Sequence, residues 1–373
     1  RPGMEHNFTG PSYTLGIEEE LMILDAETHE LVNAIEDLLD DAPDGDIKPE
    51  LMESVLEVAT RPCADITEAE RELRGLRASV IALADRHGLA LGSAGTHPYA
   101  LWEDQRIAAR TRYRELVSAL SFVARQELIF GLHVHVGVDD PDKAIHVADG
   151  MRVHLPVLMA LGANSPFWRG DLTGMASSRL PIFRQFPRVG VPPSYGTWER
   201  FEREIDFMVR SGVIADYTYL WHDVRPHPKL GTVEIRACDA QTRIEHTLGL
   251  AALIQALVKE LCEHYDEGTP LSDYPWQMLD ENRWLAARHG LDGELVDLPS
   301  SDRVSSRTLA YRLLDRLREH AEELGSADAL EGVRDLLAQG NGAHRQRVVY
   351  EANHDIREVM AAIVKATAGD SDA

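Results

Sequence analysis

Cysteine is scarce in this sequence, which has three such residues among 373. Cys63, Cys238 and Cys262 form no Cys-x-x-Cys pair, and their number is odd. A disulfide framework or a zinc ribbon requires cysteines paired at short spacings, so both are excluded. We expect all three to be small buried residues of a protein from a reducing compartment.

Long apolar runs are also missing. No segment reaches the roughly 18 uninterrupted apolar residues that a transmembrane helix requires. Residues 1–11 lack the apolar stretch of a secretory signal. The sequence therefore predicts a cytoplasmic protein with no membrane partner. Residues 1–12 are expected to be an N-terminal extension, either genuine and disordered or left over from cloning.

Basic charge is in short supply. The chain has 38 lysine and arginine residues against 62 aspartate and glutamate residues, which gives a formal net charge of −24. Such a field repels nucleic acid, so no nucleic-acid partner is expected. Most of the acidic surplus is interpreted as solvated surface. Glutamates within apolar segments need a different explanation.

Several familiar functional motifs are absent. The sequence has no Gly-x-x-x-x-Gly-Lys-Ser/Thr phosphate loop and no Gly-x-Gly-x-x-Gly after a strand. It also lacks the His-Glu-x-x-His motif of zinc proteases and the Gly-x-Ser-x-Gly motif of serine hydrolases. The usual sequence signatures for these four classes are therefore not found.

Apolar periodicity alternates between strand and helix along the chain. Strands are predicted over 13–24, 89–95, 129–138 and 231–237, and helices over 66–87, 106–127, from about 142, 243–265, 305–325, 327–339 and 346–367. Thr67 and Glu70 form a predicted capping box. This mixture favours an α+β fold with one domain over residues 13–367 and a disordered tail at 368–373. Residues 165–200, rich in Pro, Gly, Ser and Arg, are expected to be a long loop.

Three of the predicted strands place two polar side chains on one face. Strand side chains alternate between faces, so Glu18 and Glu20 point the same way. The same holds for His133 with His135, and for Glu234 with Arg236. The opposite face of each strand is largely apolar. Glu19 is the exception, and the sequence pattern does not explain a carboxylate on that face.

Carboxylates gathered on one buried wall repel each other unless a cation binds between them. Oxygen-rich ligands with one imidazole suit Mg²⁺ or Mn²⁺ better than Zn²⁺. Simpler interpretations remain for each motif alone: a solvated face for Glu-x-Glu, a structural or zinc pair for His-x-His, and a salt bridge for Glu-x-Arg. Their joint occurrence favours the metal site.

Residues 49–60 add three further carboxylates, and their geometry is open. On a helix, Glu50, Glu53 and Glu57 would share a face. On a strand, Glu53 and Glu57 would share a face and Glu50 would not. Glu57 is a candidate ligand in either case.

Several short motifs occur in a fixed order along the chain. They are Gly16-Ile17-Glu18-Glu19-Glu20, Glu53-Ser54-Val55-Leu56-Glu57-Val58-Ala59-Thr60, Gly95-Thr96-His97-Pro98, Phe130-Gly131-Leu132-His133-Val134-His135-Val136-Gly137, Ala176-Ser177-Ser178-Arg179, Asp223-Val224-Arg225-Pro226 and Gly231-Thr232-Val233-Glu234-Ile235-Arg236. Together they resemble the YbdK-type carboxylate–amine ligases, also called the glutamate–cysteine ligase type 2 family. The resemblance covers roughly residues 13–365. Glu19 departs from it, because the family often has an apolar residue there.

The resemblance implies a glutamine-synthetase-like fold: a curved, mainly antiparallel sheet with helices on its convex side. It also implies an ATP-dependent, ADP-forming ligase that activates a carboxylate as an acyl phosphate for attack by an amine. Weak glutamate–cysteine ligase activity is the example that the resemblance implies. The expected cofactors are ATP and Mg²⁺, with Mn²⁺ as a substitute.

Site residues carry over from the resemblance by position. The implied metal ligands are Glu18, Glu20, Glu50, Glu53, Glu57, His133 and Glu234. His135 and Arg236 are implied to contact the nucleotide phosphates. Arg236, Arg179 and Arg225 are implied to act in catalysis, and His97, Arg179 and Arg225 in substrate binding, because a guanidinium group fits carboxylate or phosphate.

Two other functions remain open at this stage. A metal-dependent amide hydrolase could use the same wall, since two metals can equally activate water. A catalytically silent binding protein could retain the fold alone. The expected partners are a small carboxylate and an amine, amino acids above all, and a second copy of the chain in a homo-oligomer. A lid over residues 165–200 is expected to exclude water from the intermediate.

Overall fold

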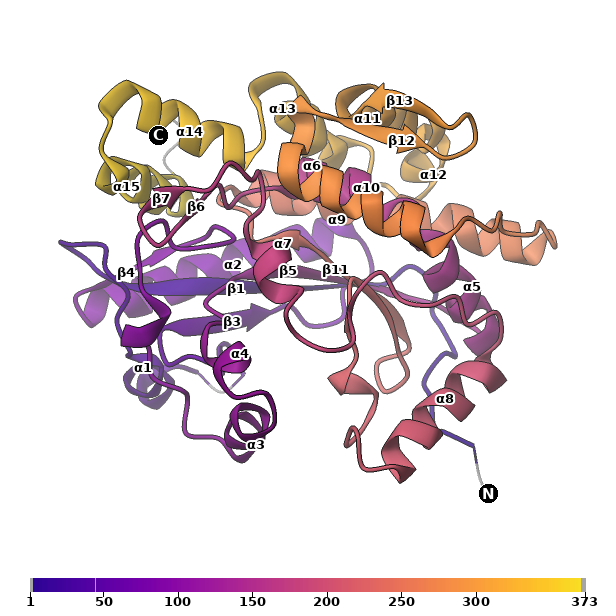
Figure 1. The fold of residues 1–373 in the computed structure, drawn as a ribbon, viewed down its shortest axis with the longest axis horizontal. Coiled ribbons are helices and arrows are strands. Elements are labelled where there is room, and N and C mark those ends of the chain that lie inside the picture. The colour runs from indigo at the N-terminus through magenta and orange to yellow at the C-terminus, as the bar shows by residue number, and fades with distance from the viewer. Residues whose placement is uncertain (1–2, 44, 370–373) are drawn as a thin grey trace.

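The computed structural model describes residues 3–43 and 45–369. Across these residues the central feature is a seven-stranded sheet whose paired strands are all antiparallel (Figure 1). The strand order is β10–β11–β5–β1–β3–β2, and β4 pairs with β1. The bounds are β1 Leu15–Asp25, β2 Lys48–Pro49, β3 Val55–Ala59, β4 Leu89–Gly92, β5 Gly131–Gly137, β10 Val224–His227 and β11 Thr232–Asp239.

Helices cover one face of this sheet, which we call the convex face. They are α2 (Ile66–Arg86), α5 (Pro141–Met151), α6 (Leu155–Gly162) and α9 (Ile244–Asp266). Ile17, Val134 and Ile235 are all at most 1% exposed and join one core cluster with residues of these helices. The alternating apolar side chains of the strands therefore bury against helices, which confirms the predicted α+β class.

The remaining helices lie above and below this layer in Figure 1. On the upper side stand α10 (Trp276–His289), α11 (Ser306–Arg316), α12 (Arg318–Glu323), α13 (Glu331–Gln339), α14 (Gly342–Asn353) and α15 (Ile356–Thr367), with the hairpin β12 (Glu294–Asp297) and β13 (Asp302–Ser305). On the lower side stand α1 (Ile35–Asp41), α3 (Thr111–Leu120), α4 (Phe122–Arg125) and α8 (Trp198–Arg210). No described helix is long and apolar enough to cross a membrane.

Three predicted helices are interrupted. The helix expected over 106–127 breaks at Ser121, whose φ is 54°, and becomes α3 and α4. The one expected over 346–367 breaks at His354, which ends α14 in a left-handed conformation. The one expected over 305–325 divides at Leu317. Apolar periodicity does not mark a one-residue change of backbone direction, so these breaks escape it.

The start of α2 also differs from the prediction. Asp65 caps this helix, and its side chain accepts a hydrogen bond from the Glu68 backbone N–H at 2.8 Å. The expected Thr67–Glu70 capping box is therefore wrong. The cap lies two residues earlier because the chain is still extended at Asp65.

Residues 165–200 are not a single long loop. They contain β6 (Phe167–Trp168), β7 (Asp171–Leu172), α7 (Arg179–Phe183), β8 (Val189–Gly190) and the first turn of α8. Ser177 in this segment is buried and donates a hydrogen bond from its hydroxyl to Asp239 at 2.8 Å. The lid role expected for the segment stays a prediction.

The chain ends were expected to stand apart from the domain. Residues 3–12 instead pack against it: Phe8 is 2% exposed, and the Asn7 N–H donates to the Pro228 carbonyl at 2.8 Å. Phe8 packs against the ring of Trp198, which supplies the apolar contact that a disordered extension would lack. Of the predicted tail, residues 370–373 lie outside the described residues, as do residues 1–2.

Glu19 has a specific partner on the convex face. Its two carboxylate oxygens each lie 2.8 Å from a guanidinium nitrogen of Arg77 on α2, and the Thr247 hydroxyl donates to it at 2.7 Å. Arg77 also donates to the backbone carbonyls of Gln241 and Thr242. Both charged side chains are at most 4% exposed, so this fully bonded pair joins β1 to α2 and α9.

Glu19→Gln is expected to lower the free energy of unfolding by about 3–5 kcal/mol, because Arg77 would remain buried without a counter-charge. Urea denaturation followed by circular dichroism measures this loss. The matched control is Glu70→Gln, on the exposed side of the same helix, where the pair with Arg74 is expected to contribute under about 1 kcal/mol. Equal losses in the two variants would contradict the structural role of Glu19.

Candidate active site

Strand register brings the predicted polar side chains together on the concave face. Glu18 on β1 lies opposite His133 on β5, and His135 lies opposite Glu234 on β11. On the other side of β1, Glu20 lies opposite Glu57 on β3. Side chains directly opposite in antiparallel strands are close neighbours. Glu18 therefore stands beside a residue of β5, and Glu20 beside a residue of β3.

The first acidic cluster consists of Glu18, His133 and Glu234, whose ligand atoms lie within 4.8 Å of one another. His133 Nδ1 is 3.2 Å from Glu18 Oε2 and 4.0 Å from Glu234 Oε1. Burial, followed by the charge of Arg236, lowers the pKa of His133 to about 4. The imidazole is therefore neutral near pH 7, which is the form that binds a metal.

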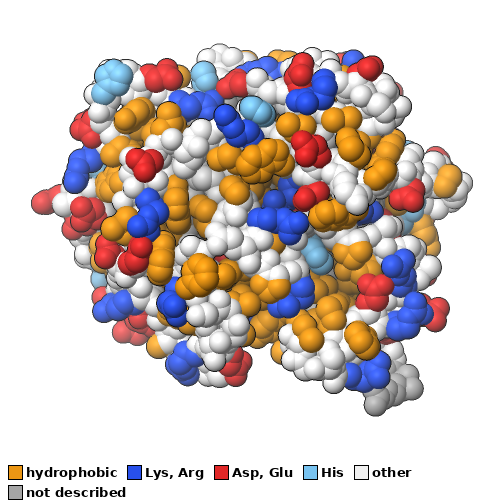
Figure 2. All heavy atoms as spheres, viewed as in Figure 1, with side chains coloured by type: hydrophobic (Ala, Val, Ile, Leu, Met, Phe, Trp, Pro, Cys, Tyr) orange, Lys and Arg blue, Asp and Glu red, His pale blue; other side chains and the backbone are white. Residues whose placement is uncertain are grey.

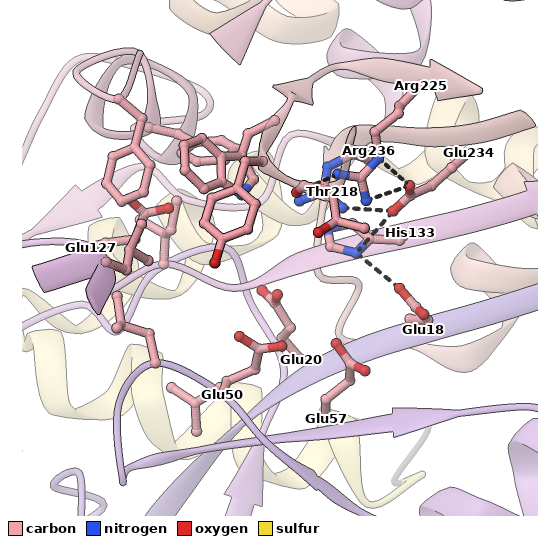
Figure 3. Close-up of a pocket in the computed structure, with 18 of the residues that line it drawn as sticks. Glu18, Glu20, Glu50, Glu57, Glu127, His133, Thr218, Arg225, Glu234 and Arg236 are labelled. Carbon is pink, nitrogen blue, oxygen red and sulfur yellow. Dashed lines mark hydrogen bonds and ion pairs between the residues drawn. The ribbon is translucent and has the colours of Figure 1, made fainter. Parts of the chain in front are cut away.

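Two arginines hold Glu234 in place (Figure 3). Arg225 donates to Glu234 Oε2 at 2.9 Å, and Arg236 donates to Oε1 at 2.6 Å. Burial alone would raise the pKa of Glu234, yet these two cations outweigh it and keep that pKa well below its usual value. Glu234 is thus ionised and fixed in orientation.

Arg225 donates its hydrogen bonds to groups of the protein itself. Besides Glu234, it donates to the carbonyls of Thr218 and Leu220, each at 2.8 Å. It lines the cavity, but these bonds assign it to positioning Glu234. The substrate contact and catalytic role expected of Arg225 are not supported by this geometry.

The second acidic cluster consists of Glu20, Glu50 and Glu57, again with ligand atoms within 4.8 Å of one another. Among the described residues, half-exposed Lys48 forms an ion pair with Glu57 at 3.6 Å, and the charges of Arg179 and Arg236 act on Glu20. Burial, followed by the charge of Glu20, raises the pKa of Glu50 to about 7. Burial and the neighbouring glutamates raise the pKa of Glu57 well above its usual value.

Both clusters fit a bound Mg²⁺ or Mn²⁺. An octahedral ion with oxygens at about 2.1 Å places adjacent ligands about 3 Å apart and opposite ligands about 4 Å apart. The ligand atoms of each cluster lie within 4.8 Å of one another, a little beyond this range. Burial and, after it, the neighbouring carboxylates raise the pKa of Glu50 and Glu57, and a divalent ion would oppose both effects.

Other polar atoms in the cavity lack partners among the described residues. Arg179 Nε and Nη1, Arg236 Nε and His135 Nε2 are buried and make no hydrogen bond. Two of these atoms nevertheless have ionic neighbours: Arg179 Nη1 lies 3.8 Å from Asp239, and His135 Nε2 lies 3.6 Å from Glu18 and 3.8 Å from Glu234. Buried donors without hydrogen bonds are costly, so these atoms are candidates to bind an anion beside the acidic clusters.

All of these groups line one cavity of about 300 Å³. Its rim includes helix α3 and the turn at Tyr217–Tyr219. Hydrophobic and basic side chains gather near the middle of the face shown in Figure 2. Figure 3 shows Glu20, Glu50 and Glu57 pointing into a common space beside Glu18 and His133.

Two predicted site residues lie outside this cavity. Glu53 stands in the turn between Glu50 and β3, and its carboxylate accepts a hydrogen bond from Arg106 at 2.7 Å. The segment is neither helix nor straight strand: β2 and β3 form a hairpin, which folds Glu50 back toward Glu57 and turns Glu53 away. The structure does not bring Glu53 together with the other candidate ligands, and its metal role stays a prediction.

His97 is the other. Its Nε2 donates to the His29 carbonyl at 2.8 Å, and its Nδ1 accepts from the Ala100 N–H at 3.0 Å. Burial lowers its pKa to about 4. The side chain is fully buried and satisfied by backbone groups, so it connects two loops and is not available to a substrate.

The sequence interpretation also missed part of the cavity lining. Glu127 lines it, together with an apolar wall of Leu116, Ile129, Phe183, Phe186 and Trp221. Ile129 and Phe183 belong to one apolar cluster. No motif marks these residues, because they come from α3, α7 and loops whose approach depends on the tertiary fold.

Solved structures share this fold. The structure of glutamate–cysteine ligase from Francisella tularensis in complex with AMP matches with a TM-score of 0.70 at 15% identity, covering 98% of this chain and 90% of that one. A bifunctional glutathione synthetase from Pasteurella multocida matches with a TM-score of 0.64 at 15% identity, over 96% of this chain and 52% of that one. These two matches show the class of fold to which the chain belongs, which it shares with both enzymes.

Sequence comparison gives the particular family. The model of Glutamate-cysteine ligase family 2 matches residues 14–365, and the chain belongs to that family. "Putative glutamate–cysteine ligase 2-1" of Rubrobacter xylanophilus is 43% identical over 367 residues, covering 98% of this chain and 97% of the relative. A relative of similar name from Sorangium cellulosum is 42% identical over 358 residues, covering 95% and 96%.

Glu50→Gln is expected to stabilise the metal-free protein at pH 8 by about 1–3 kcal/mol. The folded pKa of Glu50, about 7, lies above its ordinary value of 4.5, so ionising it costs folded-state stability as pH rises between these values. The gain over wild type should therefore disappear below about pH 4.5. Denaturation curves across this range measure it.

The same variant should lose most of the rise in melting temperature that Mg²⁺ gives the wild type. Glu53→Gln is the control, because this neighbour pairs with exposed Arg106 outside the cavity. It should keep both the wild-type pH profile and the Mg²⁺ response. A Glu50→Gln variant that is destabilised and still responds to Mg²⁺ would refute the second cluster as a metal site.

Proposed function

We propose that this protein is an ATP-dependent, ADP-forming ligase that joins a small carboxylate to an amine through an acyl phosphate. The observation that carries this proposal is one cavity with two acidic clusters facing unpaired cationic donors. A nucleotide triphosphate with divalent metals presents both the cations that the glutamates need and the anions that the arginines need.

Glu18, His133 and Glu234 would hold one metal, and Glu20, Glu50 and Glu57 a second. Bound there, Mg²⁺ would neutralise phosphate oxygens and align them for transfer. Arg236 is fixed by Glu234 and keeps a free Nε, so it can bind a phosphoryl oxygen on which charge develops. His135 donates from Nε2 when protonated, and Glu234 and Glu18 raise its pKa despite burial.

The chemistry explains why both charges are required. A carboxylate is a poor electrophile, so its oxygen first attacks the γ-phosphorus of ATP, and ADP leaves. The amine nitrogen then attacks the carbonyl carbon, and phosphate leaves with the electron pair of the C–O bond. Arg179, whose Nε makes no hydrogen bond among the described residues, would bind the carboxylate substrate.

The relatives' names point to glutamate and cysteine as the first substrates to test. The AMP in the Francisella tularensis structure supports nucleotide binding by this fold. The expected homo-oligomer stays a prediction.

The proposed function is tested by ADP release from purified protein with ATP and Mg²⁺. A ligase releases ADP only when a carboxylate and an amine are both present, and one amide forms per ADP. Amide cleavage without nucleotide would support the hydrolase instead. Neither reaction, together with no calorimetric binding of ATP and Mg²⁺, would indicate a silent binding protein.

Arg236→Lys is expected to lower kcat by about 100-fold, because a lysine point charge does not reproduce the oriented guanidinium donors. The ADP assay at saturating ATP measures this effect. Arg61→Lys is the matched control, since Arg61 is exposed and pairs with Glu72 on the surface; its kcat should equal that of wild type. Near-normal turnover by Arg236→Lys would count against its role at the phosphoryl group.

A further inference from the structure

Glu127 is a partly exposed residue with one buried carboxyl oxygen, Oε2, that makes no hydrogen bond among the described residues. It lies between α4 and β5 and lines the cavity at the end away from Glu234 and Arg225 (Figure 3). Burial, followed by the charge of Glu20, raises the pKa of Glu127 well above its usual value. An unsatisfied buried polar atom costs about 1–3 kcal/mol.

Metal binding does not account for this residue. Glu127 belongs to neither of the two clusters whose ligand atoms lie within 4.8 Å of one another. The other cavity glutamates have partners in a cluster, in Arg225 and Arg236, or in the backbone, as Glu20 does with the Gly131 N–H. A bound molecule is the partner that remains for Glu127.

The surroundings of Glu127 indicate the chemistry of that molecule. Ala124 and Ile129, on either side of it in sequence, share an apolar cluster with Phe183, Phe186 and Trp221. Glu127 and Glu20 would repel a second carboxylate here, and the charges of Arg179 and Arg236 act on Glu127 in the opposite sense. A molecule with N–H donors and an apolar body would satisfy the carboxyl oxygen and also cover the wall.

We propose that Glu127 binds the amine substrate through its N–H groups, and that the adjoining wall selects amines with an apolar side chain larger than that of cysteine. This inference rests on the proposed ligase function. The cavity then has two chemically distinct ends. Metals, Arg179 and Arg236 bind the anionic substrates at one end, while Glu127 and the apolar wall bind the amine at the other.

The first test compares amines in the ADP assay with wild-type protein, ATP, Mg²⁺ and glutamate. Leucine and phenylalanine should exceed aspartate, lysine and cysteine in kcat/KM by about tenfold or more, since each methylene placed in an apolar pocket favours binding. A preference for a charged amine or for cysteine would overturn the inference and leave the ligase function standing.

The second test is Glu127→Met, which keeps the side-chain length and removes the carboxyl oxygens. The KM for the amine should rise about tenfold or more, because the N–H groups of the bound amine would be buried without an acceptor. The KM for ATP should keep its wild-type value. The variant should also be at least as stable as wild type in denaturation, because an unsatisfied buried group has gone.

Glu115→Met is the control, since Glu115 is exposed on α3 and does not line the cavity. It should change neither KM. An unchanged amine KM in Glu127→Met, or lost stability with both KM values altered, would overturn the assignment of Glu127. If no amine gives ADP, the ligase proposal fails, and calorimetry of phenylalanine binding to wild type and Glu127→Met then tests the subsite directly.

Discussion

Repulsion among carboxylates on one buried face of β1 and its neighbours is the interaction on which the rest of this structure depends. The two acidic clusters solve it differently. Hydrogen bonds from His133 and His135 lower the pKa of Glu18, and the charges of Arg225 and Arg236 lower that of Glu234, in both cases against the effect of burial. For Glu20, Glu50 and Glu57, burial outweighs the nearby cations, and the pKa of each is raised. The protein's own groups therefore stabilise the first cluster, while the proposed cation would stabilise the second.

Stable contacts on the convex face allow the repulsion among the carboxylates on the concave face to persist. Glu18, Glu19 and Glu20 are consecutive, yet Glu19 is the only one whose carboxylate is fully paired, by the two donors of Arg77 and by Thr247. The pair fixes β1 to α2 and α9, and a broad apolar cluster surrounds it. A strand held this firmly keeps its other face from relaxing, so the acidic groups stay close together although they repel.

The alternation of side chains along strands made several of the candidate site residues predictable from sequence. The limits of this pattern explain which site residues were not predicted correctly. Alternation assigns Glu18, Glu20, His133 and Glu234 to one face without knowledge of the fold, because strand geometry is local. It does not give the register that sets Glu18 opposite His133, which depends on pairing between distant segments. It fails for Glu50 and Glu53, where a hairpin turn replaces a regular element, and for His97, whose hydrogen bonds go to a remote loop. Glu127 carries no local signal at all, since only the packing of α3 and α7 makes its surroundings a cavity wall.

The placement of both clusters on a single strand has a consequence for how this family could diversify. Glu18 and Glu20 are two residues apart on β1, so their Cα atoms are separated by about 6.8 Å, a spacing fixed by strand geometry. The two acidic clusters proposed to hold metals are therefore kept at a separation that the strand geometry sets. The wall beside Glu127, in contrast, comes from helix α3, helix α7 and connecting segments, whose side chains can change without disturbing the sheet. Activation of the carboxylate is thus tied to the rigid part of the molecule, and choice of the amine to the part that tolerates substitution.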